Sequence, residues 1–366
     1  MRRVVLVAAA LAACSGTPRP VPVAAPPAAA GDQTAPRLEL RTAVPQPQRY
    51  LARRATAPVT IDGVLDDADW QQAPWTTDFV DIEGSIRPAP RLRTRVKMLW
   101  DDSCWYVAAE LTEPDVWATI TERDAVIFHD NDFELFIDPT GTTHRYFEVE
   151  INALNTVWDL FLPKPYRDGG SAVNAWNIDG MRSAVHVDGT LDNPADRDRG
   201  WTVELAIPWR AFADSARIAV PPREGSSWRV NFSRVEWDLD TAGGAYRVHT
   251  DSAGKPAHEH NWVWSPQGAV NMHLPEMWGV VQFGGARITV DAVSDAARWT
   301  LRRVYYAERD YQAAHGQYAT SLAQLDLAAL HDVQLAARVD TWDALLPATA
   351  TRPVWHIRSD GRVWHD

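Results

Sequence analysis

Cysteine is scarce in this 366-residue chain, which contains only Cys14 and Cys104. A framework of several internal disulfides is therefore excluded, and a hydrophobic core must hold the fold together. Long hydrophobic runs are also lacking, because the apolar stretch at residues 4–13 is too short to span a bilayer as a stable helix. Positive charge is in deficit, since the net charge is -12. This balance argues against nucleic acid and against an anionic membrane surface as partners.

The first residues have the features of a targeting segment. Two arginines precede the apolar stretch, which ends in Leu-Ala-Ala-Cys at residues 11–14. Small residues before a cysteine in this position resemble a bacterial lipobox, which implies cleavage before Cys14 and lipidation of its thiol. Ser15 follows, and by the same resemblance it favours the outer membrane over retention at the inner one. The alternative is an ordinary secretory signal with an incidental cysteine.

The sequence therefore predicts a lipoprotein signal peptide at residues 1–13 and a lipid anchor at Cys14. Several acyl chains would attach such a protein stably to a membrane. Residues 14–48 are rich in proline and alanine, and such a composition cannot bury enough surface to fold. We expect this segment to be a tether. Cys104 then has no partner, and its apolar surroundings in the sequence predict a buried, inert thiol.

Residues 49–285 have the pattern of short β-strands. Segments rich in β-branched and aromatic residues alternate with turn sequences, and no long helical period interrupts them. Examples are VKMLW, CWYVAAEL, FELFID, YFEVEIN, TVELAIP, WRVNFSRVEW and WGVVQF. This pattern predicts an all-β fold, namely an antiparallel, jelly-roll-like β-sandwich. The chain also contains 18 tryptophans, a residue that recurs in ligand sites and interfaces.

The pattern changes in residues 286–366, which we predict to be a small helical appendage ending in a hairpin. Apolar residues recur at helical spacing in residues 294–314, and Gly316 is a stop signal. Ser321 and Gln324 have the spacing of a capping box, which predicts a second, shorter helix. The final hairpin is expected to turn at residues 359–361.

Two predicted strands each carry a row of polar side chains opposite an apolar face. Asp132 and Glu134 alternate with aromatic and aliphatic residues, and so do Glu148, Glu150 and Asn152. Such rows could together form the floor of a site, because carboxylates and amides bind sugar hydroxyls and are also oxygen ligands for Ca²⁺. We assign Asp132 and Glu134 as candidate metal ligands. The alternative is the solvated outer face of an antiparallel sheet, which has the same alternation.

Further candidates for the site come from a third strand and from aromatic residues in loops. Arg234 and Glu236 are expected on the polar face of their strand. Sugar rings stack their apolar faces on indole rings. The remaining candidates are Trp158, Trp176, Trp262 and His260.

Two other chemistries receive little support from the sequence. His258 and His260 have the spacing of zinc ligands on one side of a strand, but no third ligand is evident. No pair of carboxylates stands out as the acid and nucleophile of a glycosidase. A role in hydrogen bonding is therefore favoured for the histidines, and a non-catalytic role for the domain.

The order of these segments resembles carbohydrate-binding module family 9-like domains. The resemblance begins with IDGVLDDADW at residues 61–70 and continues through NDFELFID at residues 131–138 and YFEVEIN at residues 146–152. It also includes WTVELAIPW at residues 201–209 and WGVVQF at residues 278–283.

The resemblance implies a β-sandwich that binds an oligo- or polysaccharide between two tryptophans and carries calcium. The founding modules are attached to xylanases, which links the family to xylan and to polysaccharide breakdown. We assign Trp158 and Trp176 as the clamp. The predicted protein is an outer-membrane lipoprotein of the cell envelope that captures polysaccharide fragments.

Three rival functions remain open. The domain could itself hydrolyse O-glycosyl bonds, or it could be a scaffold whose pocket has decayed. It could also bind haem, as related sandwiches do. The conceivable axial ligands for haem are Met98, Met272, His273 and Met277.

Overall fold

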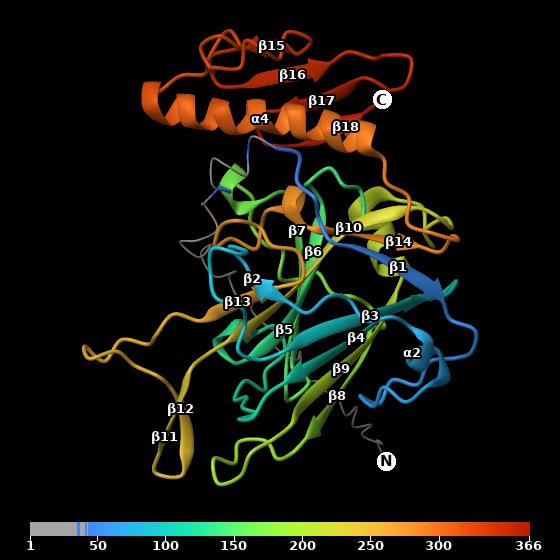
Figure 1. Ribbon diagram of the computed structural model, residues 1–366, viewed down its shortest axis with the longest axis vertical. Coiled ribbons are helices and arrows are strands. Elements are labelled where there is room, and N and C mark those ends of the chain that lie inside the picture. Colours follow the sequence, from blue (N-terminus) through green and yellow to red (C-terminus); the bar gives the residue numbers. More distant parts are fainter. Residues whose placement is uncertain (1–34, 37–40, 42) are drawn as a thin grey trace, which may run out of the picture.

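The computed structural model describes residues 35–36, 41 and 43–366. The predicted signal peptide, Cys14 and most of the predicted tether lie outside the described residues. Figure 1 shows a large body of strands, with a smaller C-terminal unit stacked at one end, which includes the long helix α4 (Ala292–His315). Among the described helices, none has the length and apolar character needed to cross a membrane.

The first sheet of the large body carries the acidic rows that the sequence predicts. Its hydrogen-bonded order is β7 (Val157–Leu162), β6 (Tyr146–Asn152), β5 (Asp132–Asp138), β10 (Ser227–Glu236), β14 (Gly279–Phe283) and β1 (Arg49–Arg54). Two short strands extend it beside β10, namely β13 (His260–Val263) and β2 (Val80–Asp81).

The second sheet continues from the first through β1. Residues 49–52 pair in parallel with β14, and residues 53–54 pair in parallel with β3. The order after β1 is β3 (Thr94–Trp100), β4 (Cys104–Thr112), β9 (Gly200–Pro208) and β8 (Arg182–Asp188). All other pairings in the two sheets are antiparallel within the described residues. The predicted all-β sandwich is confirmed.

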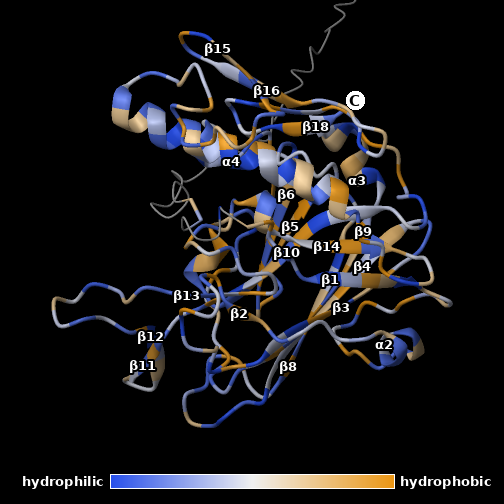
Figure 2. Cartoon of the chain, turned by 45° about the horizontal axis from the view of Figure 1, so that its top comes forward, coloured by the Kyte–Doolittle hydropathy of each residue, from blue (hydrophilic) through white to orange (hydrophobic). Residues whose placement is uncertain are grey.

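The inner faces of the two sheets enclose the main hydrophobic core. Phe133, Leu135 and Val149 face it from the first sheet, and Val107 and Leu205 face it from the second. Figure 2 shows hydrophobic residues gathered along the strands of the sandwich. Each inward residue alternates with an outward one, so the core fixes which side chains of β5 and β6 occupy the opposite face.

The segment at residues 61–70 is held to the second sheet by one buried carboxylate. Glu204 accepts hydrogen bonds from the backbone amides of Asp62 and Gly63 at 3.0 and 2.7 Å, and from the indole of Trp70 at 2.6 Å. Gly63 has a φ of +85°, and a Cβ there would lie 2.7 Å from the backbone nitrogen of His186. This turn therefore requires glycine. It leads into the short helix α2 (Ala68–Gln72).

The C-terminal unit contains a helix and a sheet. Helix α4 (Ala292–His315) begins at Asp291, whose side chain accepts from the amide of Ser294, and ends at Gly316, which has a φ of +71°. The sheet order is β15 (Gln334–Ala337), β16 (Trp342–Leu346), β17 (Trp355–Arg358) and β18 (Val363–His365).

The structure corrects one detail of the predicted appendage. The expected second helix after Ser321 is wrong, because the chain forms turns there. The side-chain oxygen of Gln324 instead accepts from the backbone amide of Thr320 and from the hydroxyl of Ser321. The predicted terminal hairpin is present as β17 and β18, within a four-stranded sheet that the sequence analysis did not predict.

A buried charged network joins α4 to the sandwich. Arg167, in η3 (Tyr166–Asp168), forms a 2.8 Å ion pair with Glu276, in η5 (Pro275–Met277). The hydroxyl of Tyr306 also donates to Glu276, and the hydroxyl of Tyr305 donates to Asp168 at 2.6 Å. Since both tyrosines come from α4, these bonds fix the C-terminal unit against two turns of the sandwich.

The remaining elements lie at the periphery. The hairpin of β11 (Leu239–Ala242) and β12 (Ala245–Val248) projects from the sandwich (Figure 1). The other short segments are the 3₁₀-helix η2 (Ile127–His129), the helix α3 (Arg210–Phe212) and the π-helix η4 (Ala213–Arg217). Cys104 is half-buried and forms no disulfide with a described residue.

Candidate functional site

The outer face of the first sheet brings together polar residues of three neighbouring strands. Ser233 on β10 lies opposite Glu134 on β5, and Glu134 lies opposite Glu150 on β6. The same row continues to Trp158 on β7. Directly paired residues of antiparallel strands project to the same face, so these four side chains form one line across the sheet.

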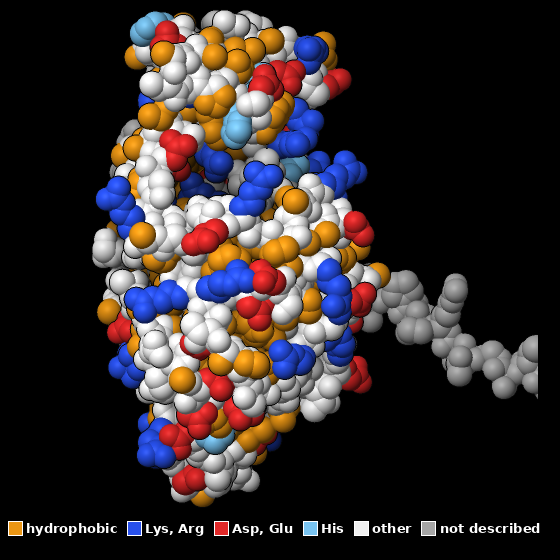
Figure 3. Space-filling model, turned by 90° about the vertical axis from the view of Figure 1, so that its right-hand side faces the viewer, with side chains coloured by type: hydrophobic (Ala, Val, Ile, Leu, Met, Phe, Trp, Pro, Cys, Tyr) orange, Lys and Arg blue, Asp and Glu red, His pale blue; other side chains and the backbone are white. Residues whose placement is uncertain are grey.

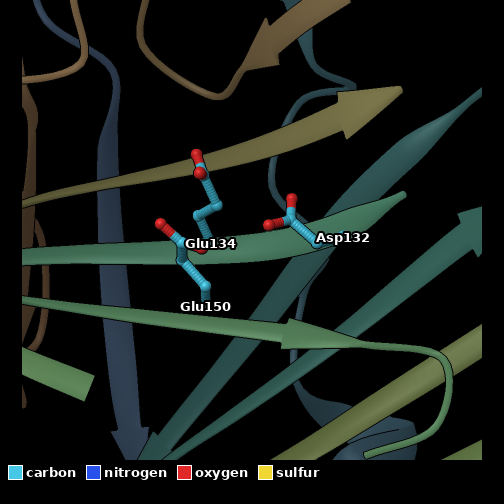
Figure 4. A group of neighbouring side chains, drawn as sticks. All are labelled: Asp132, Glu134 and Glu150. Atoms are coloured by element: carbon cyan, nitrogen blue, oxygen red, sulfur yellow. The ribbon is translucent and has the colours of Figure 1, made fainter. Parts of the chain in front are cut away.

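Two neighbouring rows enlarge the acidic group. Asp132 pairs with Asn152 on one side of the line, and Phe136 pairs with Glu148 on the other. Figure 4 shows Asp132 and Glu134 projecting from one strand on the same side as Glu150 from its neighbour. We call Asp132, Glu134, Glu148 and Glu150 the acidic cluster.

The acidic cluster is buried. The sequence analysis expected either the floor of a site or a solvated outer face, and neither expectation included burial. Its four side chains are at most 5% exposed, because loops and η2 cover the sheet there. Burial, together with the neighbouring carboxylates Glu134 and Asp130, raises the pKa of Asp132 well above its usual range. Burial and the charges of Glu134 and Asp132 raise the pKa of Glu150 in the same way. Carboxylates crowded together in a buried place repel one another, so the cluster favours protons or a cation.

The geometry of the acidic cluster fits a hard cation. Asp132, Glu134 and Glu150 each offer an oxygen, and these three atoms lie within 4.8 Å of one another. Oδ2 of Asp132 and Oγ of Ser233 are buried and have no hydrogen-bond partner among the described residues. Carboxylate and hydroxyl oxygens are ligands that Ca²⁺ accepts. Asp132, Glu134 and Glu150 would hold such an ion, and it would neutralise the charge that burial makes unfavourable.

Asn152 has a structural task beside the cluster. Its amide nitrogen donates to the backbone carbonyl of Ile120 and to Asp130, and its oxygen accepts from the amides of Leu154 and Thr156. All of its hydrogen-bonding groups are therefore engaged within the protein. The structure places this residue in the predicted row, where it shapes the turn after β6.

The two tryptophans predicted to clamp a sugar lie on opposite faces of the first sheet. Trp158 is 3% exposed and packs among the residues that cover the outer face. Trp176 packs on the inner side, where its ring centroid is 4.7 Å from that of Phe147. The predicted clamp is therefore wrong, because the sheet itself separates the two rings.

Arg234 and Glu236 also lie on the opposite face from the acidic cluster. Phe232 pairs with Leu135 and faces the core, so residues 234 and 236 have the same inward orientation. The predicted common polar face with Glu148 is wrong for β10. Arg234 instead pairs with Glu236 at 2.8 Å and with Glu113 at 2.6 Å.

This second polar group includes the other two predicted site residues. Trp262 on β13 pairs with Arg234 on β10, and the guanidinium of Arg234 lies 5.4 Å from the centroid of the Trp262 ring. His260 stacks on Trp262 and contacts Asp238 at 3.2 Å. Burial and the nearby Glu236 raise the pKa of Glu113 to about 8. The charged groups of this second polar group therefore pair with one another within the protein.

Two half-buried aromatic residues lie beside the acidic cluster, namely Phe128, which sequence reasoning missed, and Trp237, which is one of the loop tryptophans that the sequence suggests for stacking. The backbone amide of Phe128 donates to Glu150 at 3.0 Å, and the indole of Trp237 donates to the carbonyl of Phe128 at 2.9 Å. Ser233 was missed as well. Its place on the acidic face follows from the β5–β10 register, which could not be read from one strand alone.

The residues considered for haem do not converge on one site. Met98 lies in the core between the sheets, Met272 lies beneath the outer face, and Met277 contacts the C-terminal unit. Burial and Arg167 lower the pKa of His273 to about 3, and its Nδ1 lies 2.9 Å from the hydroxyl of Tyr146. The structure therefore offers no axial pair among the residues that the sequence suggested.

The sandwich matches a known protein family over most of its length. The family described as carbohydrate family 9 binding domain-like matches residues 61–285, which include the acidic cluster and the Glu204 turn. The chain belongs to this family. No curated protein matches it.

The chain is also similar to solved structures. A carbohydrate-binding module family 9 from Caldicellulosiruptor kristjanssonii, in complex with cellotriose, is 16% identical, with a TM-score of 0.41 over 67% of this chain and 100% of its own. The glucose complex from the same organism is 15% identical, with the same coverage and TM-score. A candidate carbohydrate-binding protein from Bacteroides uniformis is 16% identical, with a TM-score of 0.48 over 65% of this chain and 100% of its own.

Proposed function

We propose that this family 9 domain binds a carbohydrate at the outer face of its first sheet, without hydrolysing it. Membership of the family supports carbohydrate binding as the general activity. The observation that carries the location is the acidic cluster, which gathers carboxylates of two adjacent strands on one face. The cluster is buried and supports this face from beneath, since Glu150 accepts a hydrogen bond from the backbone amide of Phe128 at 3.0 Å.

The half-buried Phe128 and Trp237 support the same location. Phe128 is bonded to Glu150 and Trp237 is bonded to Phe128, and a half-buried aromatic ring is suited to the apolar face of a sugar. These two residues replace Trp158 and Trp176 as the proposed stacking surface. The ligand class that we propose is an oligosaccharide from a plant or microbial polysaccharide, such as xylan.

The setting that we propose is the cell envelope. The first residues resemble a lipoprotein signal, and Cys14 would carry the lipid. The following Pro/Ala-rich tether would hold the sandwich away from the outer membrane. Such a protein would capture polysaccharide fragments during their breakdown.

A binding measurement tests the proposed site. Glu150→Gln keeps the shape of the side chain and removes its charge, so we expect oligosaccharide affinity to fall at least about ten-fold, equivalent to ~1.4 kcal/mol. Isothermal titration with cello- and xylo-oligosaccharides in the presence of Ca²⁺ measures this change. The control Glu110→Gln alters a half-exposed carboxylate on β4 and should bind like the wild type.

Equal affinity of Glu150→Gln and the wild type would remove the acidic cluster from the site. Reducing-sugar release by the wild-type protein would contradict the non-catalytic part of the proposal. Circular dichroism of each variant separates a lost contact from a lost fold.

We further propose that calcium occupies the acidic cluster. In the metal-free protein, the raised pKa values of Asp132 and Glu150 mean that the folded state binds more protons than the unfolded state. Stability should then fall as the pH rises above about 4, where unfolded carboxyl groups lose their protons. Calcium should reverse this loss, because its ligands are ionised carboxylates.

Thermal unfolding with EDTA or with calcium at pH 5 and pH 8 tests this proposal. We expect calcium at a hundred-fold excess over its Kd to add about 2.7 kcal/mol of stability at pH 8, and less at pH 5. Asp132→Asn should reduce the calcium effect and raise the stability of the metal-free protein at pH 8. An effect of calcium that is equal in wild type and Asp132→Asn would refute this placement.

A further inference from the structure

A groove between the sandwich and the C-terminal unit gathers four arginines. It is open to solvent, has a volume of about 400 Å³, and is lined by Arg145, Arg217, Arg358 and Arg362. Figure 3 shows lysine and arginine side chains on both sides of the hollow that separates the two parts of the molecule. Such a concentration is unexpected in a chain with a net charge of -12.

The four arginines come from three segments that are distant in the sequence. Arg145 lies in the turn between β5 and β6, and Arg217 is the last residue of η4. Arg358 ends β17, and Arg362 immediately precedes β18. Since one pair belongs to the sandwich and the other to the C-terminal unit, the docking of the two parts creates the groove.

Acidic partners offset little of this charge. Arg358 pairs with Asp360 at 2.6 Å, and His144 lies 3.5 Å from the same carboxylate. Within the described part of the chain, no salt bridge involves Arg145, Arg217 or Arg362. These three arginines therefore keep their charges facing a common space.

A second arginine group at the same boundary is organised differently. Arg49 and Arg229 both form ion pairs with Asp295, at 2.8 and 3.4 Å. One carboxylate bridges that pair, whereas within the described residues no carboxylate bridges Arg145, Arg217 and Arg362. The difference indicates that the groove is arranged for an external anion.

The side chain of Arg145 has an unsatisfied donor, which also points to an anion in the groove. Its Nε is buried and has no hydrogen-bond partner in the part of the chain that the structure describes, and its guanidinium lies 5.6 Å from the centroid of the Phe161 ring. Burial and the nearby Arg217 and Arg362 lower the pKa of Arg145. An unsatisfied donor beside like charges is unfavourable unless a ligand accepts from it.

We propose that this groove binds a multiply charged oxyanion of the phosphate monoester class. Guanidinium groups present paired donors that match phosphate and carboxylate oxygens. A phosphate monoester carries about -1.5 to -2 charges near neutral pH, which suits the three uncompensated arginines better than one carboxylate does. The site is separate from the acidic cluster and independent of the carbohydrate proposal.

Titration calorimetry of the purified protein at low ionic strength tests this site. The probes are inorganic phosphate, glucose 6-phosphate and glucuronate. We expect both phosphates to bind more tightly than glucuronate, and Arg217→Gln/Arg362→Gln to weaken phosphate binding at least ten-fold. Both residues are exposed, so the variant should fold. Because it relieves repulsion, its melting temperature without phosphate should equal or exceed that of the wild type.

The matched control removes the same charge elsewhere. Arg182 on β8 and Arg247 on β12 are exposed and lie outside the groove, so Arg182→Gln/Arg247→Gln should keep its affinity within two-fold. Equal loss in both double variants would reduce the effect to net charge and overturn the site. Equal phosphate affinity in wild type and Arg217→Gln/Arg362→Gln would overturn it as well, as would no phosphate binding to the wild type. Preference for glucuronate over both phosphates would overturn the assignment to phosphate.

Tighter binding of glucose 6-phosphate than of inorganic phosphate would identify a phosphorylated sugar as the source of the anion. Equal binding of the two would identify the phosphate group alone as what is recognised. Either result supports the proposal, because the shared chemistry is the phosphate.

Discussion

Replacing Arg167 with methionine is expected to lower the free energy of unfolding by about 3–5 kcal/mol, the range typical of breaking a buried ion pair. Arg167 is 5% exposed and pairs with the buried Glu276 between the sandwich and α4. Methionine fills much of the volume but leaves the carboxylate without its main cation. Urea unfolding followed by tryptophan fluorescence measures the change.

The control Arg309→Met removes an arginine that contacts the same network from its edge. Arg309 reaches Asp168 at 3.4 Å, and its side chain is 34% exposed. Solvent screens such a contact, so we expect a loss of at most about 1 kcal/mol. Similar losses in the two variants would contradict the special importance of the Arg167–Glu276 pair.

The pH dependence gives a second readout of the same pair. Burial alone would raise the pKa of Glu276, but Arg167 and Arg302 lower it to about 2. Its contribution to stability is therefore complete above the pKa of the unfolded carboxyl group and is lost as the pH falls toward 2. In Arg167→Met this acid-dependent loss should be smaller.

Replacing Glu204 with leucine is expected to lower the free energy of unfolding by about 3–5 kcal/mol, because it leaves three donors, two of them buried, without an acceptor. The donors are the amides of Asp62 and Gly63 and the indole of Trp70. Glu204 is fully buried, so water cannot replace the lost bonds without opening the turn. Thermal and urea unfolding measure the loss.

Glu110→Leu is the matched control, because Glu110 lies on β4, which pairs with the strand of Glu204. Its carboxylate pairs with Arg93 and Arg95, and its side chain is 31% exposed. We expect a loss of at most about 1 kcal/mol. If Glu204→Leu were as stable as Glu110→Leu, the carboxylate would not be what fixes the turn at residues 61–70.

The sandwich could be predicted because the pattern that defines each strand lies within the strand itself. Alternation in β5 and β6 is visible in the sequence, and the core face of each strand follows from it. The helix predicted at residues 294–314 is present as α4, and Gly316 ends it as expected. The sheet of the C-terminal unit was not predicted, because β15 and β16 are short and their polar connections obscure the alternation.

The candidate site was predictable only in part, because it depends on register. The acidic rows of β5 and β6 were found from alternation, and the structure places them side by side. Arg234 looked like a third member, yet its pairing partners give it the opposite orientation. Burial was also invisible, since the segments that cover the face come from residues far along the chain. Neither the register between strands nor the burial of a face can be read from the sequence of a single strand.

The double pairing of β1 has a consequence for how the chain reaches its native state. The first strand of the sandwich must find β14, which lies at the far end of the domain in sequence. Contacts of such long range slow folding, because the chain loses loop entropy before it gains their energy. Helix α4 forms from local contacts and needs no such search. We therefore expect the two sheets to be joined late, when synthesis has passed residue 283, and the apolar strands to be vulnerable to aggregation until then.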